Sequence, residues 1–439
     1  MIKREIYLNQ LVSRINNGLI KIITGIRRCG KSYLLFNIFY EYLLSQGVKA
    51  ENIIRIALDN DDFIDLRNPL RLKKYIQERI YNQSEHFFIF IDEIQFCYKI
   101  KKDDIDEKFV APEDRDSLYI TFYNVLNSFL SHKNIDIYIT GSNSKMLSSD
   151  IASIFRGRGD CIQVHPLSFA EYYSFCGGDK SDAWENYSVY GGMPQAVLEA
   201  NESRKRSYLV NLFENVYLKD IVERYKLADD ILIENIINVL SSSIGSLTNP
   251  HKLVNTLSSV CKIKTSDVTL NRYLNILTES FLFSKVNRYD VKGKKYFNTP
   301  NKYYAEDTGL RNAKLNWRQQ EKTHLMENIL FNELKIRGYS VDVGVVGIDT
   351  INAEKRQLIN HEIDFIVNTG FKQIYIQSAF ALLNAEKENQ ELLPLRHCKN
   401  SFEKYVITGS NEKKWIDEDG IIHIGIIPFL LDKEIVGKE

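Results

Sequence analysis

Apolar runs alternate with amphipathic stretches along the first third of the chain. Four runs are typical of buried strands because apolar residues dominate them; they cover residues 19–25, 53–59, 86–95 and 135–143. Three stretches are predicted to be helices; they cover residues 31–47, which carry an apolar face, 70–83, which carry a polar face, and 119–131. This alternation predicts an α/β fold in which helices cover both faces of a parallel sheet. A charged, weakly periodic segment at 98–117 is predicted to be a surface insertion.

The pattern changes near residue 166 and becomes mostly helical as far as about residue 315. Within this part, three short helices between 230 and 280 precede an extended stretch at 283–298 that predicts a hairpin. A helix at 321–339 then leads into four strand candidates, at 339–347, 361–368, 372–380 and 403–409. We therefore expect four parts: an α/β core at 1–165, a helical lid at 166–229, a helical region with a hairpin at 230–315, and a second α/β domain at 316–439.

Composition narrows the class of protein. A length of 439 residues, with 44% hydrophobic and 26% charged residues, is typical of a globular protein with several domains. The formal net charge is zero, so overall charge does not argue for nucleic-acid binding, although a local basic patch still can. None of the six cysteines forms a CxxC pair, and no apolar signal core or run of 18 apolar residues occurs. We expect reduced thiols, a cytoplasmic location and no membrane partner.

The stretch TGIRRCGKSYLL lies between the first apolar run and the first helix. It contains Gly25, four further residues and then Gly30-Lys31-Ser32, which is the complete spacing of a phosphate-binding loop. Glycines let backbone N–H groups turn inward around phosphate oxygens, Lys31 reaches the β and γ phosphates, and the Ser32 hydroxyl ligates Mg²⁺. The flanking strand and helix disfavour the alternative, a glycine-rich turn. Further members of the predicted ATP-binding set lie in the same stretch: Arg28, Cys29 and Tyr33.

The run at 86–95 ends in Asp92 and Glu93, which can supply the acidic half of a nucleotide site. Asp92 is predicted to hold the magnesium shell, and Glu93 to orient and polarise the attacking water. The alternative is a solvated strand end, which the phosphate loop upstream disfavours. The two motifs together predict an enzyme that binds ATP and Mg²⁺ and hydrolyses the ATP.

Two later segments are candidates for contacts near the γ phosphate. The run at 135–143 ends in Thr140, Ser142 and Asn143, which either touch this phosphate or the attacking water, or only form a turn. Arg156 and Arg158 follow in FRGRG. An arginine on such a loop can stabilise transition-state charge, often on the nucleotide of a neighbouring subunit, and the alternative is a surface arginine. Ser142 and Arg158 are thus candidate catalytic residues, and a homo-oligomer is a candidate assembly.

At this point the chain resembles a prokaryotic group of AAA-superfamily ATPases that carry a C-terminal domain of unknown function. TGIRRCGKSYLL, IFIDEIQ, TGS, FRGRG and HPLSFAEYY occur in the order of that group, and YGGMPQAV, YLKDIVERY and KYYAEDTGLRNA extend the resemblance over nearly the whole chain. The resemblance implies a P-loop NTPase fold. By position it assigns the site to Gly25, Gly30, Lys31, Ser32, Asp92, Glu93, Ser142 and Arg158. Arg27 and Arg28 match the paired arginines typical of the group's loop, as extra cations beside the phosphates.

Residues 230–298 look like a winged helix-turn-helix, a module that can place its third helix in the major groove of double-stranded DNA. The residues forward on that helix are Thr269, Asn271 and Arg272. The wing carries three lysines for phosphate contacts: Lys292, Lys294 and Lys295. The alternative is a helical module that contacts protein.

The C-terminal part resembles the restriction-endonuclease-like fold of the same family. That resemblance implies a metal site with a glutamate on a helix, matched by Glu327, and an aspartate at a strand end, matched by Asp364. Where the family has Glu-x-Lys, this chain has Gln377 and Ala379. Because one carboxylate and the lysine are replaced, magnesium affinity and water activation should both suffer, and an inactive domain is expected.

Three functions stay open at the level of sequence. The leading hypothesis is a magnesium-dependent ATPase whose hydrolysis drives a conformational switch acting on a partner, with DNA as a candidate. An ATP-gated nuclease would require metal-dependent cleavage that disappears with Asp364→Ala. A nucleotide-binding scaffold would release phosphate no faster than its Lys31→Ala variant, and the intact Asp92-Glu93 pair argues against it.

Overall fold

The computed structural model describes residues 2–82, 84–103, 105–142, 157–227, 230–352, 355–370, 372–382, 384–398, 401–432 and 434–436. The chain forms two compact units, one of residues 3–164 and one made mainly of residues 165–439. None of the helices in the described residues has the length and apolar character that a bilayer-spanning segment requires.

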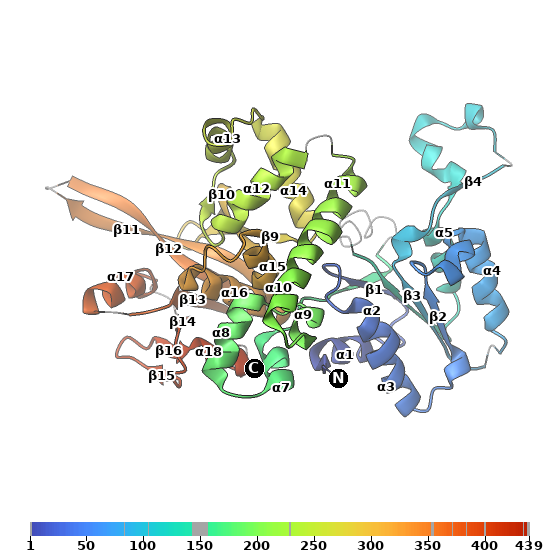
Figure 1. The fold of residues 1–439 in the computed structure, drawn as a ribbon, viewed down its shortest axis with the longest axis horizontal. Coiled ribbons are helices and arrows are strands. Elements are labelled where there is room, and N and C mark those ends of the chain that lie inside the picture. The colour runs from blue at the N-terminus through green and yellow to red at the C-terminus, as the bar shows by residue number, and fades with distance from the viewer. Residues whose placement is uncertain are drawn as a thin grey trace. The chain divides into compact units, whose positions relative to one another are not determined.

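A five-stranded parallel sheet forms the centre of the first unit (Figure 1). Its strands, in spatial order, are β2 (Ile53–Ala57), β3 (Phe87–Asp92), β6 (Ile135–Thr140), β1 (Ile20–Thr24) and β7 (Gly159–Gln163). Because all strands are parallel, their carboxyl ends lie at one edge of the sheet. The predicted P-loop NTPase sheet is therefore confirmed, and β6 lies between β1 and β3.

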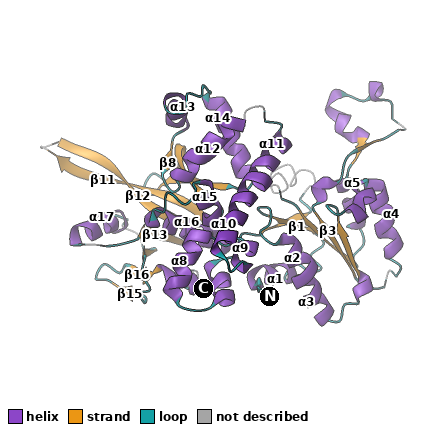
Figure 2. Cartoon of the chain, viewed as in Figure 1, coloured by secondary structure: helices purple, strands orange, loops and turns teal. Residues whose placement is uncertain are grey.

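Helices cover both faces of this sheet, as the alternating pattern predicts (Figure 2). They are α1 (Glu5–Val12), α2 (Lys31–Tyr33), the π-helical turn η1 (Leu34–Phe39), α3 (Tyr40–Ser45), α4 (Pro69–Arg79) and α5 (Phe122–Phe129). Side chains that alternate along β3 divide between the faces: Phe87, Ile89 and Ile91 join a core with α4 and α5. On the other face, the ring of Phe39 from η1 lies 5.5 Å from that of Phe90.

The segment around 98–117 is a mostly exposed excursion from the first unit, which confirms the predicted surface insertion. Its base is a two-stranded antiparallel ladder, formed by β4 (Ile100–Lys101) and β5 (Tyr119–Ile120). Short 3₁₀ turns occupy the insertion and the loops of the unit: Ala50–Asn52, Asp61–Arg67, Ile94–Phe96, Glu107–Phe109 and Pro112–Leu118.

The second unit begins with helices. They are α7 (Phe169–Cys176), α8 (Lys180–Tyr190), α9 (Pro194–Leu198), α10 (Glu202–Asn211), the π-helical turn η8 (Leu212–Leu218) and α11 (Lys219–Tyr225). The helical region predicted before the hairpin contains α12 (Asp230–Ser242), α13 (Pro250–Ser259) and α14 (Asp267–Glu279). Later helices are α15 (Thr308–Lys314), α16 (Lys322–Ile336), α17 (Ala385–Arg396) and α18 (Ile426–Leu431).

One nine-stranded mixed sheet runs through the second unit (Figure 1). In spatial order its strands are β15 (Trp415–Ile416), β16 (Ile422–Gly425), β14 (Glu403–Thr408), β13 (Gln373–Ala379), β12 (Lys355–Asn368), β11 (Ser340–Asn352), β9 (Phe283–Asp290), β10 (Lys295–Ala305) and β8 (Leu247–Thr248). The predicted hairpin is β9–β10, and β9 also pairs in parallel with β11. The hairpin is thus continuous with the C-terminal strands, and the boundary predicted at residue 315 falls within one compact unit. The division into four parts stays a prediction.

Three motifs of the sequence meet around the buried carboxylate of Asp307. The N–H of Gly192, from YGGMPQAV, donates to Asp307 Oδ2 at 2.7 Å. The carbonyl of Gly192 accepts the N–H of Leu167, from HPLSFAEYY, at 2.8 Å. Glu306, beside Asp307 in KYYAEDTGLRNA, pairs with His165 at 2.6 Å. These motifs therefore hold α7, α8 and α15 together in the second unit.

Candidate active site

The phosphate loop after β1 is packed against the chain that leaves β7. Gly25 has a φ of +139°, and a Cβ there would lie 2.0 Å from the carbonyl oxygen of Val164. The same oxygen accepts the thiol of Cys29 at 3.3 Å, while the N–H of Val164 donates to Thr24 at 2.8 Å. Arg4 donates to the carbonyl of Cys29 at 3.1 Å from outside the loop. Only glycine fits at position 25, because any side chain would meet backbone.

The loop has the backbone form of an anion-binding nest. Arg28 has a φ of +62° and Gly30 one of +99°, both in the left-handed region, between residues of ordinary conformation. Alternation of this kind turns successive N–H groups toward one side. The buried Lys31 donates from Nζ to the carbonyls of Gly25 and Ile26, both at 3.0 Å, so its ammonium lies within the loop. These N–H groups and this ammonium fit a phosphate chain.

Ser32 and Asp92 meet across the gap between β1 and β3. The side chains of the two residues are hydrogen-bonded, and the hydroxyl of Thr140, on the intervening β6, donates to Asp92. Burial raises the pKa of the Asp92 carboxyl, and the hydrogen bonds from Thr140 and Ser32 oppose that shift. A carboxylate and a hydroxyl side by side are hard oxygen ligands, which fit Mg²⁺.

Glu93 follows directly, in a conformation that is unusual for a residue with a side chain. Its φ is +52°, and its N–H donates to the Thr140 hydroxyl at 3.0 Å. The side-chain amide of Gln95 donates to the Glu93 carboxylate and lies 3.4 Å from the hydroxyl of Ser142. Gln95 thus links the predicted base, Glu93, to the candidate catalytic residue Ser142. The sequence contained a signal for this contact, because Gln95 lies two residues after Glu93 in IFIDEIQ, but no role was predicted for it.

The other predicted loop residues differ in exposure. Arg27 is half-buried, Arg28 is exposed and Tyr33 is 45% exposed, so all three have side chains open to solvent. Cys29 is fully buried and its thiol donates to the carbonyl of Val164, so its side chain has a packing role. A contact between Cys29 and a nucleotide would therefore be made by its backbone. Asn143 and Arg156, the other candidates of their segments, lie outside the described residues.

Arg158 lies at the opposite end of the sheet from the phosphate loop. Its carbonyl accepts the N–H of Ile20, the first residue of β1, at 2.9 Å, and its side chain is exposed. Gly25 follows the last residue of β1, so at about 3.3 Å per residue the backbone of Arg158 is on the order of 16 Å away. The structure therefore brings Lys31, Ser32, Asp92, Glu93 and Ser142 together within one chain, but not Arg158.

In the second unit, the two acids predicted from the C-terminal resemblance do lie together, around a lysine. Glu327 Oε1 is 3.0 Å and Asp364 Oδ1 3.5 Å from Nζ of Lys302, a residue of β10. Gln377 instead donates from Nε2 to Glu391 at 3.0 Å. No short motif predicts a role for Lys302, because it lies 25 residues before Glu327 and 62 residues before Asp364 along the chain.

The predicted DNA-contact residues differ in solvent exposure and in their hydrogen bonds. On α14, Asn271 and Arg272 are exposed whereas Thr269 is half-buried. In the turn between β9 and β10, Lys292 donates from Nζ to the carbonyl of Gly347 on β11. All three wing lysines are exposed: Lys292, Lys294 and Lys295. A groove contact would therefore use mainly the exposed members of both sets.

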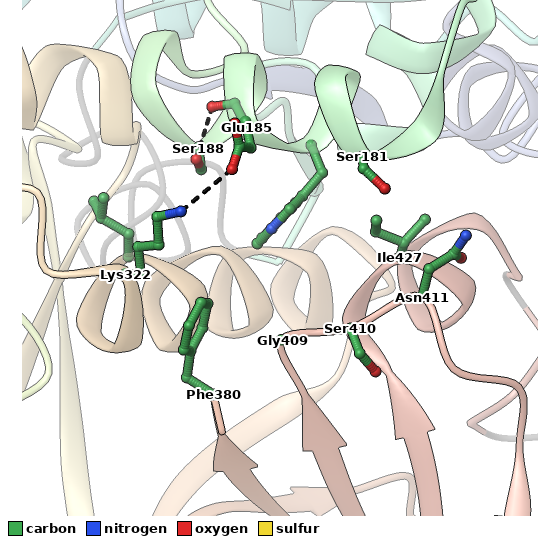
Figure 3. A pocket seen from close by; sticks show the side chains of 11 residues that line it. Ser181, Glu185, Ser188, Lys322, Phe380, Gly409, Ser410, Asn411 and Ile427 are labelled. Carbon is green, nitrogen blue, oxygen red and sulfur yellow. Dashed lines mark hydrogen bonds and ion pairs between the residues drawn. The ribbon is translucent and has the colours of Figure 1, made fainter. Parts of the chain in front are cut away.

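A pocket of about 210 Å³ lies elsewhere in the second unit (Figure 3). Phe380, Gly409 and Ser410 line it where β13 and β14 end, a place where α/β sheets often hold ligands. At its rim Lys322 of α16 pairs with Glu185 of α8 at 3.2 Å (Figure 3). Ligand pockets commonly span roughly 300–1,000 Å³, so this one is small, and no residue predicted from the sequence lines it.

Comparison with known proteins places these features in context. A family model of an AAA domain matches residues 17–173, and a model of a domain of unknown function matches residues 181–321. An uncharacterized protein of Haemophilus influenzae is 34% identical over 436 residues, which are 98% of this chain and 99% of that protein. An uncharacterized protein of Methanocaldococcus jannaschii is 26% identical over 406 residues, 89% of this chain and 80% of that protein.

Among solved structures, Cdc6p from Pyrobaculum aerophilum is similar over 75% of this chain and 94% of its own, with 12% identity and a TM-score of 0.28. The Orc1 protein of Aeropyrum pernix, solved in complex with DNA, is similar over 72% of this chain and 93% of its own, with 12% identity and a TM-score of 0.26. Scores of this size support no argument about fold or function.

Proposed function

This chain belongs to the AAA-domain family of ATPases, and from that membership we propose that it is a magnesium-dependent ATPase whose hydrolysis drives a conformational switch. One observation carries the proposal. Ser32 in α2, Asp92 and Glu93 at the end of β3, and Thr140 at the end of β6 form one continuous set of hydrogen bonds, and Lys31, next to Ser32 in the chain, points its ammonium into the loop. A binding loop alone needs no such acidic half.

In this proposal the loop N–H groups and Lys31 bind the β and γ phosphates, and Ser32 and Asp92 hold Mg²⁺. When bound, Mg²⁺ neutralises charge on the phosphate oxygens. Glu93 accepts a proton from the attacking water and orients it, while Gln95 and the Thr140 hydroxyl fix the Glu93 side chain and backbone. Ser142, through Gln95, is placed to respond to the state of the γ phosphate.

Two variants test the assignment together. Lys31→Ala should lose ATP binding and hydrolysis, whereas Glu93→Gln should bind ATP and stop turnover. Equilibrium nucleotide binding and steady-state phosphate release measure the two steps separately, and Lys74→Ala, an exposed lysine on α4, is the matched control. If Glu93→Gln hydrolyses ATP at the wild-type rate, Glu93 is not the base. If wild type releases phosphate no faster than Lys31→Ala, with or without DNA, the chain is a nucleotide-binding scaffold.

We further propose that the second unit reads out the switch on a partner, with double-stranded DNA as the candidate. The support is the exposure of Asn271 and Arg272 on α14 together with Lys294 and Lys295 in the hairpin turn. ATPase turnover measured against a panel of nucleic acids tests this, since a DNA partner should change the rate. The change should weaken in a Lys294→Glu/Lys295→Glu variant, and an unchanged rate with every nucleic acid would favour a protein partner.

Cleavage of nucleic acid is not part of the proposal. Gln377 and Ala379 replace the carboxylate and lysine that the C-terminal resemblance requires, and Gln377 is bonded to Glu391. We expect no cleavage of DNA or RNA with Mg²⁺ or Mn²⁺. Metal-dependent cleavage that disappears with Asp364→Ala would instead establish the ATP-gated nuclease.

A further inference from the structure

A buried cluster of opposite charges lies where the helices, the hairpin and the C-terminal strands of the second unit meet. Lys302 of β10 is 3% exposed, and its Nζ pairs with Glu327 of α16 at 3.0 Å and with Asp364 of β12 at 3.5 Å. Glu362, two residues before Asp364 on β12, is a third ion-pair partner. One ammonium is therefore shared by three carboxylates from two other elements.

Other hydrogen bonds fix the carboxylates around this ammonium. The hydroxyl of Tyr304 donates to Glu327 Oε1 at 2.7 Å, the same oxygen that Lys302 contacts. The N–H of Ser378 donates to Asp364 Oδ2 at 2.9 Å. The backbone also packs closely, since a Cβ at Gly245 would lie 3.1 Å from Glu327 Oε1. The carboxylates are thus held in place by the fold and turned toward one point.

The convergence of these carboxylates favours a positive charge at that point. Three carboxylates that face one point repel one another, and the ammonium of Lys302 compensates for their charge. Removing the ammonium would leave the two buried carboxylates of Glu327 and Asp364 without compensation, which is strongly destabilising.

We propose that this cluster is a cation site whose resident cation is the chain's own Lys302 ammonium. Glu327 and Asp364 are the two acids at which the C-terminal resemblance implies a divalent metal, and Lys302 Nζ lies between them. Gln377 and Ala379 stand where the resemblance has Glu and Lys, and the ammonium of Lys302 supplies the positive charge that a metal ion would supply. The domain keeps the carboxylates and dispenses with the metal.

The backbone of β10 accounts for the position of Lys302. The ladder between β9 and β10 shifts register between Phe297 and Lys302, and irregularities of this kind redirect the side chains that follow. Beyond the shift, Lys302 lies opposite Val286 on β9 and opposite Leu247 on β8. The ammonium therefore links the hairpin to α16 and β12 by charge, and movement of the hairpin has to move the C-terminal strands as well. This inference does not depend on ATP hydrolysis.

Thermal unfolding of the full chain in EDTA tests the proposal. Lys302→Met keeps the length of the side chain without its charge and should lower the unfolding midpoint by roughly 5–15 °C. Lys314→Met is the matched control, because the side chain of Lys314 is also only 8% exposed but its partners Glu214 and Glu234 are about 40% exposed. It should lower the midpoint less. Equal loss in both variants, or no loss in Lys302→Met, overturns the proposal.

Charge compensation separates a cation site from packing. The midpoint of Lys302→Met should recover in part when Glu327→Gln removes one buried charge, or when Mn²⁺ is added as a replacement cation. Failure of both to restore it overturns the proposal. A titration of wild type with Mn²⁺ does not require any variant of Lys302 to fold. If Mn²⁺ raises the wild-type midpoint and Asp364→Asn abolishes the rise, the carboxylates bind metal with Lys302 present, and the proposal is wrong.

Discussion

Thr140, the last residue of β6, donates its side-chain hydroxyl to the carboxylate of Asp92, the last residue of β3. The same hydroxyl oxygen accepts the N–H of Glu93 at 3.0 Å. One side chain on the strand between β1 and β3 therefore orients both the proposed magnesium ligand and the backbone of the proposed base. Groups that orient a metal ligand typically change metal affinity or activity by about 10–100-fold when removed.

Thr140→Val should weaken the binding of the Mg²⁺ on which hydrolysis depends. Valine keeps the shape of threonine but cannot donate to Asp92, so the pKa of Asp92, already raised by burial, should rise further. We expect the Mg²⁺ concentration for half-maximal ATPase rate to rise about tenfold. Thr140→Ser keeps the hydroxyl and serves as the control. Equal Mg²⁺ dependence in wild type and Thr140→Val would mean that Thr140 does not orient a magnesium ligand.

Gln95→Ala should lower turnover without changing ATP affinity. Its amide contacts the Glu93 carboxylate and lies 3.4 Å from Ser142, so its loss frees the base to adopt other orientations. A misplaced base typically costs at least about tenfold in rate, because proton transfer needs close and aligned groups. Single-turnover hydrolysis and equilibrium ATP binding separate the two effects, and Gln77→Ala on the exposed face of α4 is the control. A faster variant would show that Gln95 restrains Glu93.

The phosphate loop and the acid pair could be predicted because each is contained in a short, contiguous pattern. Gly25, Lys31 and Ser32 are fixed by spacing along the chain, and Asp92-Glu93 by their place at the end of an apolar run. The contact of Thr140 with Asp92 depends on strand order, since β6 is inserted between β1 and β3. Strand order is set by packing across the sheet and leaves little trace in local pattern.

Longer-range features were harder to predict for the same reason. Lys302 reaches Asp364, 62 residues away along the chain, through the register of β10 and its irregularity, neither of which periodicity reveals. The position of Arg158 follows from the direction of β7, which begins beside Ile20 and ends beside the loop. A motif shows that an arginine is present but not at which end of a strand it lies. The roles assigned to individual site residues stay predictions.

The buried Asp307 should make the stability of the second unit depend on pH. Its carboxylate accepts the N–H groups of Gly192 at 2.7 Å and Leu310 at 2.9 Å, yet burial raises its pKa to about 6. The usual value in an unfolded chain is about 3.9, so the folded protein retains a proton between these values that the unfolded chain has lost. The raised pKa therefore makes its full contribution to the free energy of unfolding below about pH 4. This contribution is lost as pH rises through 6, and it falls by about 2 kcal/mol between pH 4.5 and 7.

Urea unfolding of wild type and Asp307→Asn across that window measures this contribution. Other groups titrate in both proteins, so the difference between them isolates position 307. The free energy of unfolding of wild type, relative to that of the variant, should fall by about 2 kcal/mol from pH 4.5 to pH 7. A difference that is constant over this range would contradict a raised pKa at Asp307.

Arg158 should contribute to hydrolysis only across a subunit boundary. Its backbone lies at the end of β1 remote from the loop, on the order of 16 Å away, and its side chain is exposed there. Arg158→Ala should therefore lower turnover by up to about 10³-fold if the chain assembles so that this arginine faces a neighbour's nucleotide. Mixing Arg158→Ala subunits with Lys31→Ala subunits should recover activity, because each supplies what the other lacks.

The control for this experiment is Arg71→Ala, which changes an exposed arginine on α4. An inactive mixture of two inactive variants, or full activity of Arg158→Ala alone, would remove the support for this role.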